Sequence, residues 1–132
     1  MNKKSLIQEK WEQSPGYVYF IAAGDPIVAI KIGVTKQKGM KQRLGSHQSS
    51  NHVPLRILAV IPFEGMERPM VEAEKKEKEL HKKFAHLQRF QSGWVGSEWF
   101  TVSDELLKEI DKIGTKPSEL GIKDTIARIA HI

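Results

Sequence analysis

The chain has 132 residues, with 21 Lys and Arg against 16 Asp and Glu, which gives a formal net charge of +5 at pH 7. This length predicts a single domain, and the modest positive charge permits nucleic-acid binding without requiring it. The absence of cysteine excludes disulfides and thiolate metal sites. No apolar run approaches the roughly 18 residues of a membrane span, and the N-terminus lacks the apolar stretch of a secretory signal. We therefore expect an intracellular, cytoplasmic protein.

The first segment predicts a short helix over residues 5–12, with Ser5 as its N-cap. Leu6, Ile7 and Trp11 fall on a common side of this helix. A Ser-Pro-Gly sequence at residues 14–16 then breaks it and starts a strand. We interpret residues 1–14 as an N-terminal arm ahead of a domain over residues 15–102.

Two β-rich runs, residues 17–23 and 27–34, flank a Gly-Asp-Pro turn and predict a hairpin. Tyr19 lies on the first run and Lys31 on the second. The turn alone leaves the register open, so the spacing does not decide whether these two side chains face each other. Gly33, near the end of the second run, indicates either a bulge or a place where another group approaches the backbone closely.

The segment after the hairpin, residues 36–47, predicts a helix whose start is weakened by Gly39. Arg43 lies beside the apolar stripe of this helix, and His47 follows one turn later. No acidic residue interrupts the sequence from Lys31 to Arg43, so the segment is either a solvated face or a surface that follows a phosphate backbone. We favour the second interpretation. The nucleic-acid-binding residues that it predicts are Lys36, Lys38, Lys41 and His47.

The rest of the chain predicts one more long strand and three more helices. The strand is Leu55–Phe63, and residues 97–102 form a short strand or extended segment. The helices cover residues 71–89, Asp104–Ile113 with Ser103 as N-cap, and roughly 123–130. The fold class is therefore α/β (α+β), a small and mainly antiparallel three-stranded sheet flanked by helices. Residues 103–132 form a C-terminal helical extension.

Glu77 is the one carboxylate on the inward stripe of the helix over residues 71–89, between Ala73 and Leu80. An ionised carboxylate on an apolar face is costly unless it is paired or bound to a cation. It is therefore either a partner in a buried ion pair or a ligand of Mg²⁺. Arg43 presents the matching choice, because it either pairs with Glu77 or holds a phosphate with two hydrogen bonds.

Tyr19 is either a partly buried core residue whose hydroxyl bonds to the backbone or a group that transfers protons. The second role needs a pKa well below the usual value of about 10. Lys31 is either an exposed edge charge or the group that lowers this pKa or acts as base itself. The histidines offer no pair with metal-ligand spacing, since His81 and His86 are five residues apart, so we expect no zinc site.

Taken in order, these segments resemble the motifs of the GIY-YIG nuclease superfamily. The strand from Pro15 to Tyr19 looks like the GIY strand, and Lys31-Ile32-Gly33 looks like the YIG strand. Arg43-Leu44 is similar to the helix arginine, and the segment from Glu77 through His81 to Phe84 is similar to the helix with the metal-binding glutamate. Glu98-Trp99-Phe100 resembles the E-W-F signature of the phage-associated branch, whose second strand reads KIG.

The resemblance implies a phosphodiester hydrolase that acts on DNA with Mg²⁺ or Mn²⁺. Glu77 would hold the metal, Arg43 would stabilise charge on the phosphoryl oxygens, and Tyr19 assisted by Lys31 would help deprotonate water. Lys31 departs from the tyrosine that most of the superfamily carries, although some similar restriction nucleases use lysine there. Glu98 either orients the site or caps the final strand, and His47 and His81 are second-tier candidates.

Three hypotheses remain open. The first is a metal-dependent DNA endonuclease. The second is a catalytically silent nucleic-acid-binding or regulatory module on the same fold. The third is an unrelated structural α/β protein in which Glu77 and Arg43 are simply paired. A nuclease of this size would gain specificity from a homodimer or a partner protein, and the C-terminal apolar residues offer either that contact or more core: Leu120, Ile122, Ile126, Ile129 and Ile132.

Overall fold

The computed structural model describes residues 5–49, 53–89 and 99–125 and contains one antiparallel sheet of four strands. The strands are β1 (Gly16–Ala23), β2 (Ala29–Lys36), β3 (Leu55–Phe63) and β4 (Trp99–Thr101), in the order β3-β1-β2-β4. The α+β class is confirmed, but the expectation of three strands is wrong by one. The fourth strand, β4, lies within residues 97–102, which the sequence predicts as a short strand or extended segment, and its pairing with the start of β2 makes it part of the sheet.

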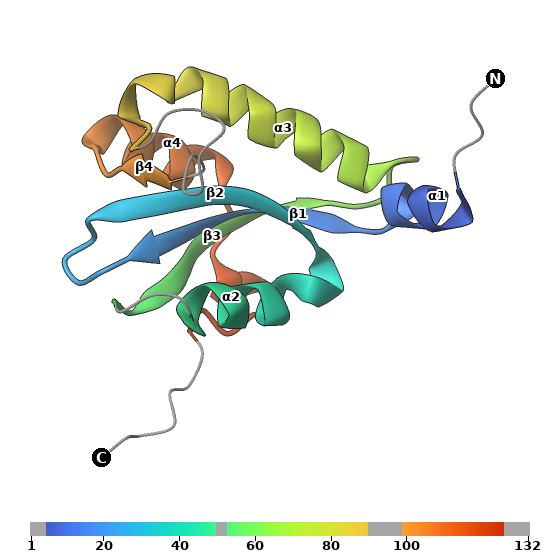
Figure 1. Ribbon diagram of the computed structural model, residues 1–132, viewed down its shortest axis with the longest axis horizontal. Coiled ribbons are helices and arrows are strands. Elements are labelled where there is room, and N and C mark those ends of the chain that lie inside the picture. Colours follow the sequence, from blue (N-terminus) through green and yellow to red (C-terminus); the bar gives the residue numbers. More distant parts are fainter. Residues whose placement is uncertain (1–4, 50–52, 90–98, 126–132) are drawn as a thin grey trace, which may run out of the picture.

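Helices cover both faces of this sheet (Figure 1). They are α1 (Leu6–Gln13), α2 (Met40–Ser49), α3 (Pro69–Lys83) and α4 (Asp104–Ile113). Short 3₁₀ turns lie at Gln37–Gly39, Ala85–Leu87 and Pro117–Leu120. Helix α2 covers one face, α3 and α4 cover the other, and α1 lies at one end.

The core has two layers because β1 is buried along its whole length. On one side, Val18 and Phe20 pack with residues of α3 and α4, including Leu80 and Leu106. On the other side, Tyr19 packs with apolar residues of α2 and β3. Helix α4, which the sequence assigned to a C-terminal extension, therefore shares the core of the sheet. None of the helices in the described ranges is long and apolar enough to span a membrane.

Several boundaries differ from the sequence expectations. Strand β2 begins two residues later than predicted, because the turn extends until the Val28 N–H bonds to the Ala23 carbonyl at 2.9 Å. Helix α2 proper starts at Met40 after a 3₁₀ turn that contains Gly39. The long helix predicted over residues 71–89 stops at Lys83 and continues only as a 3₁₀ turn. Residues 123–125 are not helical, and the remainder of the expected tail helix lies outside the described residues.

Helix α1 has its predicted Ser5 cap, which accepts a hydrogen bond from the Gln8 N–H. However, the side that the sequence marked as apolar is not buried, since Leu6 and Ile7 are each 83% exposed. Glu12 is buried instead. A buried carboxylate is tolerated here because Gln8 Nε2 donates to it at 3.2 Å and Arg68 Nε lies 3.9 Å away.

Candidate active site along strand β2

The register of the β1–β2 hairpin settles which predicted residues share a face. Tyr19 pairs with Gly33, and Ile21 pairs with Lys31. Directly paired residues lie on one face, as do residues two apart on a strand, so Tyr19 and Lys31 both lie on the face that α2 covers. They are diagonal neighbours, a relation that separates two residues by roughly 7–8 Å in a regular sheet.

Gly33 allows the Tyr19 side chain to lie across β2. A methyl group at position 33 would overlap the hydroxyl and ring carbons of Tyr19. The pairing of β1 with β2 is continuous through Gly33, so this glycine is not a bulge. The register shift lies instead on the other side of β1, between Phe20 and Ile21 in the pairing with β3. Close approach is therefore the reason for glycine at this position.

Helix α2 supplies the partner of the Tyr19 hydroxyl. The Tyr19 oxygen lies 3.2 Å from His47 Nε2, and the two ring centroids are 6.1 Å apart. Tyr19 is 2% exposed, whereas His47 is half-buried. Tyr19 is thus a core residue, but its hydroxyl bonds to an imidazole rather than to the backbone. The hydrogen bond links a buried phenol to a group that reaches the surface.

Lys31 is half-buried and lies opposite the first residue of β4. It pairs with Trp99, and its ammonium nitrogen lies 5.7 Å from the centroid of a Trp99 ring, within cation–π range. Within the described part of the chain, the β2 residues that pair with β4 are Ala29, Ile30 and Lys31. The second half of β2 therefore has no described strand on its outer edge.

Helix α3 passes this outer edge. The His81 Nε2–H donates to the Ile32 carbonyl at 2.9 Å, and the Met70 side chain packs against Gly16, which pairs with Lys36. Helix α3 therefore runs antiparallel to β2, from the Lys36 end toward Ile32. His81, a second-tier catalytic candidate, serves here to satisfy a carbonyl at the edge of the sheet.

Glu77 lies one turn before His81 on the same side of α3. The four residues from Glu77 to His81 rise about 6 Å along the helix, which is close to the length of two strand residues. Because His81 bonds to Ile32, Glu77 is level with the Gly33–Val34 region of β2. Its neighbours along the helix, Ala73 and Leu80, are buried, and Glu77 itself is half-buried. The predicted metal ligand is thus level with the β2 segment over which Tyr19 extends, but it lies on α3, which covers the opposite face of the sheet from α2.

Arg43 approaches the same strand from α2. It is exposed, one turn before His47, and lines a hollow of about 390 Å³ together with Val34 and Thr35. Across the described residues, no ion pair joins Arg43 to Glu77. The simple pairing offered as an alternative for these two residues is therefore not what this structure shows.

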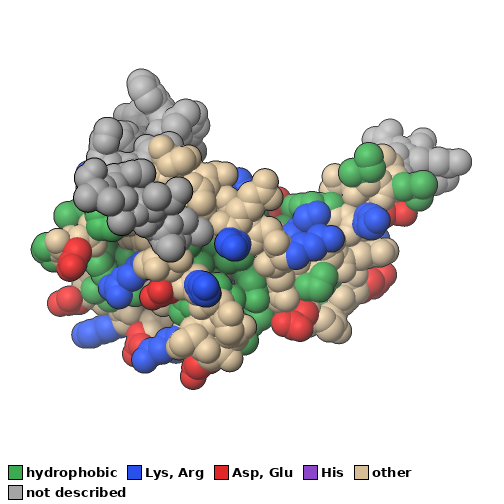
Figure 2. Space-filling model, turned by 90° about the horizontal axis from the view of Figure 1, so that it is seen from below, with side chains coloured by type: hydrophobic (Ala, Val, Ile, Leu, Met, Phe, Trp, Pro, Cys, Tyr) green, Lys and Arg blue, Asp and Glu red, His purple; other side chains and the backbone are tan. Residues whose placement is uncertain are grey.

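The basic segment that the sequence presents as one cluster is divided by α2. Lys36 lines the hollow with Arg43, whereas Lys38 and Lys41 line a second hollow of about 570 Å³. Lys123, from the C-terminal segment, also lines the second hollow. Figure 2 shows Lys and Arg side chains spread over this face with Asp and Glu side chains among them. The surface offers two groups of cations, one on each side of α2.

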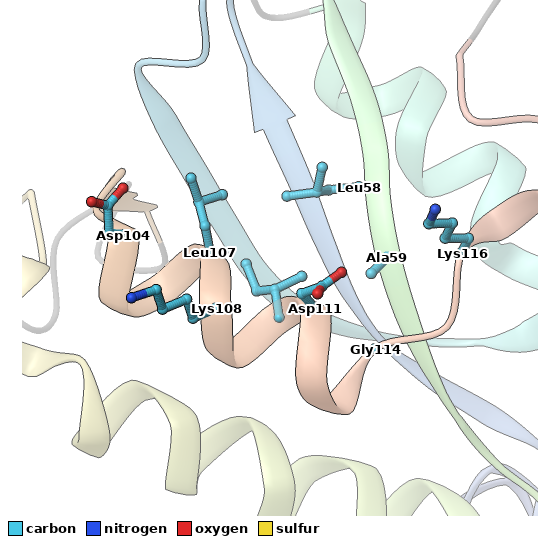
Figure 3. A pocket seen from close by; sticks show the side chains of 9 residues that line it. Leu58, Ala59, Asp104, Leu107, Lys108, Asp111, Gly114 and Lys116 are labelled. Carbon is cyan, nitrogen blue, oxygen red and sulfur yellow. The ribbon is translucent and has the colours of Figure 1, made fainter.

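A third hollow, of about 420 Å³, lies between β3 and α4 (Figure 3). Its apolar walls include Leu58 and Leu107, and Asp104, Asp111 and Lys108 lie along α4. None of the predicted site residues lines it. It is also at the β3 edge of the sheet, two strands away from β2, so it plays no part in the candidate site.

The donor groups suit a metal that needs few protein ligands. In the described ranges, no three His, Asp or Glu side chains are grouped so that they could hold a metal ion. Mg²⁺ commonly takes only one or two protein carboxylates and completes its shell with water and substrate phosphate. The single Glu77 carboxylate fits that pattern. Glu98 lies outside the described residues, so its expected role is not tested by the structure.

Sequence reasoning missed part of the surroundings of Arg43. Trp11 and Gln42 line the same hollow. The sequence grouped Trp11 with the apolar residues of α1, and an isolated tryptophan in an amphipathic helix carries no signal that separates core from site. Gln42 directly precedes Arg43 on an exposed helix surface, and only the position of α1 brings it opposite Trp11.

The fold and site define a class: an α+β domain with tyrosine, lysine, arginine and glutamate arranged around one strand of an antiparallel sheet. The T5orf172 domain model matches residues 16–114, and the chain belongs to that family. This is a phage-associated domain linked to nuclease-like folds, and it indicates a nuclease or DNA-binding role. A search of curated proteins and a search of solved structures each gave no match. The matched region begins at β1 and includes α4, while α1 precedes it.

Proposed function

We propose that this protein is a metal-dependent endonuclease that hydrolyses DNA phosphodiester bonds at a GIY-YIG-like centre. The observation that carries the proposal is the packing of Tyr19 across Gly33 onto His47, on the face it shares with Lys31. A buried tyrosine needs a partner for its hydroxyl, and here that partner is an imidazole that reaches the surface, with a lysine on the same face of the sheet. Arg43 and Glu77 lie beside the same half of β2.

Tyr19, Lys31 and His47 would manage the proton of the attacking water. The Lys31 ammonium lies on the same face as the phenol, and its charge would compensate negative charge that develops near the attacking water. The phenol would accept a proton from the attacking water while passing its own proton along the 3.2 Å hydrogen bond to His47, which reaches the surface. His47 thereby joins the proton-transfer group, in addition to the nucleic-acid contact predicted from the sequence.

Arg43 and Glu77 would position and neutralise the phosphate. The exposed Arg43 guanidinium can hold two phosphoryl oxygens and stabilise the negative charge that grows on them during attack. Glu77 would hold Mg²⁺ or Mn²⁺ near the scissile phosphate and the leaving 3′ oxygen. The bound metal would supply Lewis-acid stabilisation of that phosphate and leaving oxygen.

A catalytically silent DNA-binding module is the second candidate. It is favoured by Lys31, which stands where the superfamily usually carries tyrosine and whose ammonium lies near the Trp99 ring. A lysine held by an aromatic ring can serve the fold alone. The two groups of cations on either side of α2 would still bind a phosphate backbone in this case.

The test is nicking of supercoiled plasmid by wild-type protein with Mg²⁺, with Mn²⁺ and with EDTA, compared with two variants of α2. Arg43→Ala should lower the nicking rate by about 10²-fold or more, because it removes a group that binds developing charge. Lys41→Ala, on the other side of the helix, removes a predicted backbone contact and not a group that binds developing charge, so it should weaken DNA binding and lower nicking by less than about tenfold. DNA binding by all three proteins without metal-dependent nicking by any would replace the enzyme with the binding module.

A further inference from the structure

The hollow beside Arg43 has walls from several elements, including Gly39 of a 3₁₀ turn and Met70 of α3. Helix α1 contributes Trp11, the end of β2 contributes Thr35 and Lys36, and α2 contributes Gln42 and Arg43. Its volume of about 390 Å³ is in the range of small-molecule sites. Helix α1 precedes the residues that match the family, so the Trp11 wall is a feature of this chain beyond the matched domain.

The chemistry of the walls suits a nucleotide. Lys36 and Arg43 bring two positive charges, and among the described lining residues there is no carboxylate to oppose them. Such a pair favours a phosphate. Gln42 and Thr35 add an amide and a hydroxyl, and the indole of Trp11 offers a flat face on which a base can stack, a contact that tolerates every base.

Trp11 is fixed in place rather than carried on a loose arm. The next residue, Glu12, is 7% exposed and is bonded to Gln8 Nε2 at 3.2 Å, with Arg68 Nε at 3.9 Å. The segment that follows α1 is also held in place, because the Pro15 carbonyl accepts a hydrogen bond from the Gln37 N–H at 2.9 Å. A rigid wall lowers the entropy cost of stacking a base on it.

We propose that this hollow receives one unpaired nucleotide adjacent to the cleaved phosphate, with its base stacked on Trp11 and its phosphate held by Lys36 and Arg43. This inference rests on the proposed function and names its substrate class. Arg43 lines this hollow and lies one helical turn from His47, the partner of Tyr19, so a nucleotide bound there would lie next to the proposed centre. A base inside a duplex is stacked on its neighbours and cannot reach Trp11 without leaving the helix. The site therefore prefers single-stranded or gapped DNA over continuous duplex.

The test measures binding in EDTA, so that it does not depend on cleavage. Labelled oligothymidylate and a fully paired duplex of equal length are titrated with wild type, Trp11→Leu and Trp11→Phe. Trp11→Leu keeps an apolar side chain but loses the aromatic face, and it should weaken single-strand binding at least tenfold while duplex binding changes less than about twofold. Trp11→Phe should retain most of the single-strand affinity. Leu6→Ala, an exposed position on the same helix, is the matched control.

A second readout uses the wild-type protein alone and covers the case in which Trp11→Leu fails to fold. A short single strand with 2-aminopurine should lose fluorescence on binding, because stacking on an indole quenches that base. A rise in fluorescence, or equal losses of single-strand and duplex affinity in Trp11→Leu, would overturn the inference and leave the proposed nuclease intact. If wild type bound neither oligonucleotide, the DNA role itself would fail along with this site.

Discussion

At the scale of single residues, Gly33 leaves the space in which the Tyr19 side chain lies across β2. The sequence predicted that Gly33 either formed a bulge or allowed close approach, and the structure selects close approach by the Tyr19 ring. The sequence predicts Tyr19, Lys31, Arg43 and Glu77 as catalytic residues. Tyr19 and Arg43 lie beside the second half of β2, and Glu77 is level with it on α3. Lys31 lies in the first half, which pairs with β4. The contact between Tyr19 and His47 could not be predicted, because it joins residues 28 positions apart on β1 and α2. It depends on how α2 packs on the sheet and on the register of the β1–β2 hairpin, which the turn leaves open.

Gly33→Ala should therefore damage the centre more than the fold. The added methyl group must displace the buried Tyr19 ring, so we expect loss of most nicking activity and a cost of about 1–3 kcal/mol in the free energy of unfolding. Plasmid nicking and denaturant unfolding measure the two effects.

The matched control for this change is Gly45→Ala, on the same α2 helix that carries His47. Apart from its chain neighbours and the backbone of α2 itself, no heavy atom of the described residues lies within 4 Å of a methyl group built at Gly45. Alanine there should raise the free energy of unfolding by about 0.5–1 kcal/mol and leave nicking unchanged. Full activity in Gly33→Ala would show that the Tyr19 position does not matter to the reaction.

At the scale of elements, patterns that are local to one segment predicted the structure well. Strand β3 spans the expected Leu55–Phe63, and α4 begins after the expected Ser103 cap, which accepts from the Leu106 N–H at 3.1 Å. The misplaced features depend on other segments. Whether β4 joins the sheet depends on its pairing with β2, and the exposure of Leu6 and Ile7 accompanies the burial of Glu12 on the side of α1 that faces Arg68.

An ion pair between α3 and α4 gives these elements a pH-dependent contact. Lys83 Nζ donates to a Glu109 carboxylate oxygen at 2.9 Å, and this hydrogen bond lowers the pKa of Glu109 below its usual 4.5. Because the pKa of Glu109 is lower in the folded state than in the unfolded state, the ion pair stabilises the protein at pH values above the unfolded-state pKa. This stabilisation is lost as the pH falls through the folded-state pKa.

Glu109→Gln should therefore reduce the free energy of unfolding by about 0.2–1 kcal/mol at pH 7, since Lys83 is half-exposed and the pair is screened by solvent. The gap between variant and wild type should close as the pH is lowered well below 4.5. Denaturant unfolding at pH 7 and at the acidic pH measures this difference in the free energy of unfolding. A gap of equal size in acid would mean that packing, and not the charge of Glu109, causes the difference.

At the scale of the whole molecule, the order β3-β1-β2-β4 decides where the site lies. Strand β4 covers only the edge of the first three residues of β2, so the edge of the rest of that strand is open to a hydrogen bond from α3. Helix α3 lies over one face of the sheet and α2 over the other. Composition could indicate a basic surface, but it could not show that α2 divides the lysines into two groups or that α1 closes the hollow beside Arg43. Those facts depend on packing between segments distant in sequence.

The central claim is that Glu77 supplies the metal-binding carboxylate of a DNA hydrolase, and Glu77→Gln tests it most directly. Glutamine keeps the shape of the side chain and removes its charge. The matched control is Glu79→Gln on the opposite side of α3, where the carboxylate makes a surface pair with Lys76 at 3.1 Å and is 67% exposed. In plasmid nicking with Mg²⁺, we predict a loss of at least about 10²-fold for Glu77→Gln. Glu79→Gln should match wild type, and both variants should still bind DNA in EDTA. Wild-type nicking by Glu77→Gln would contradict the account.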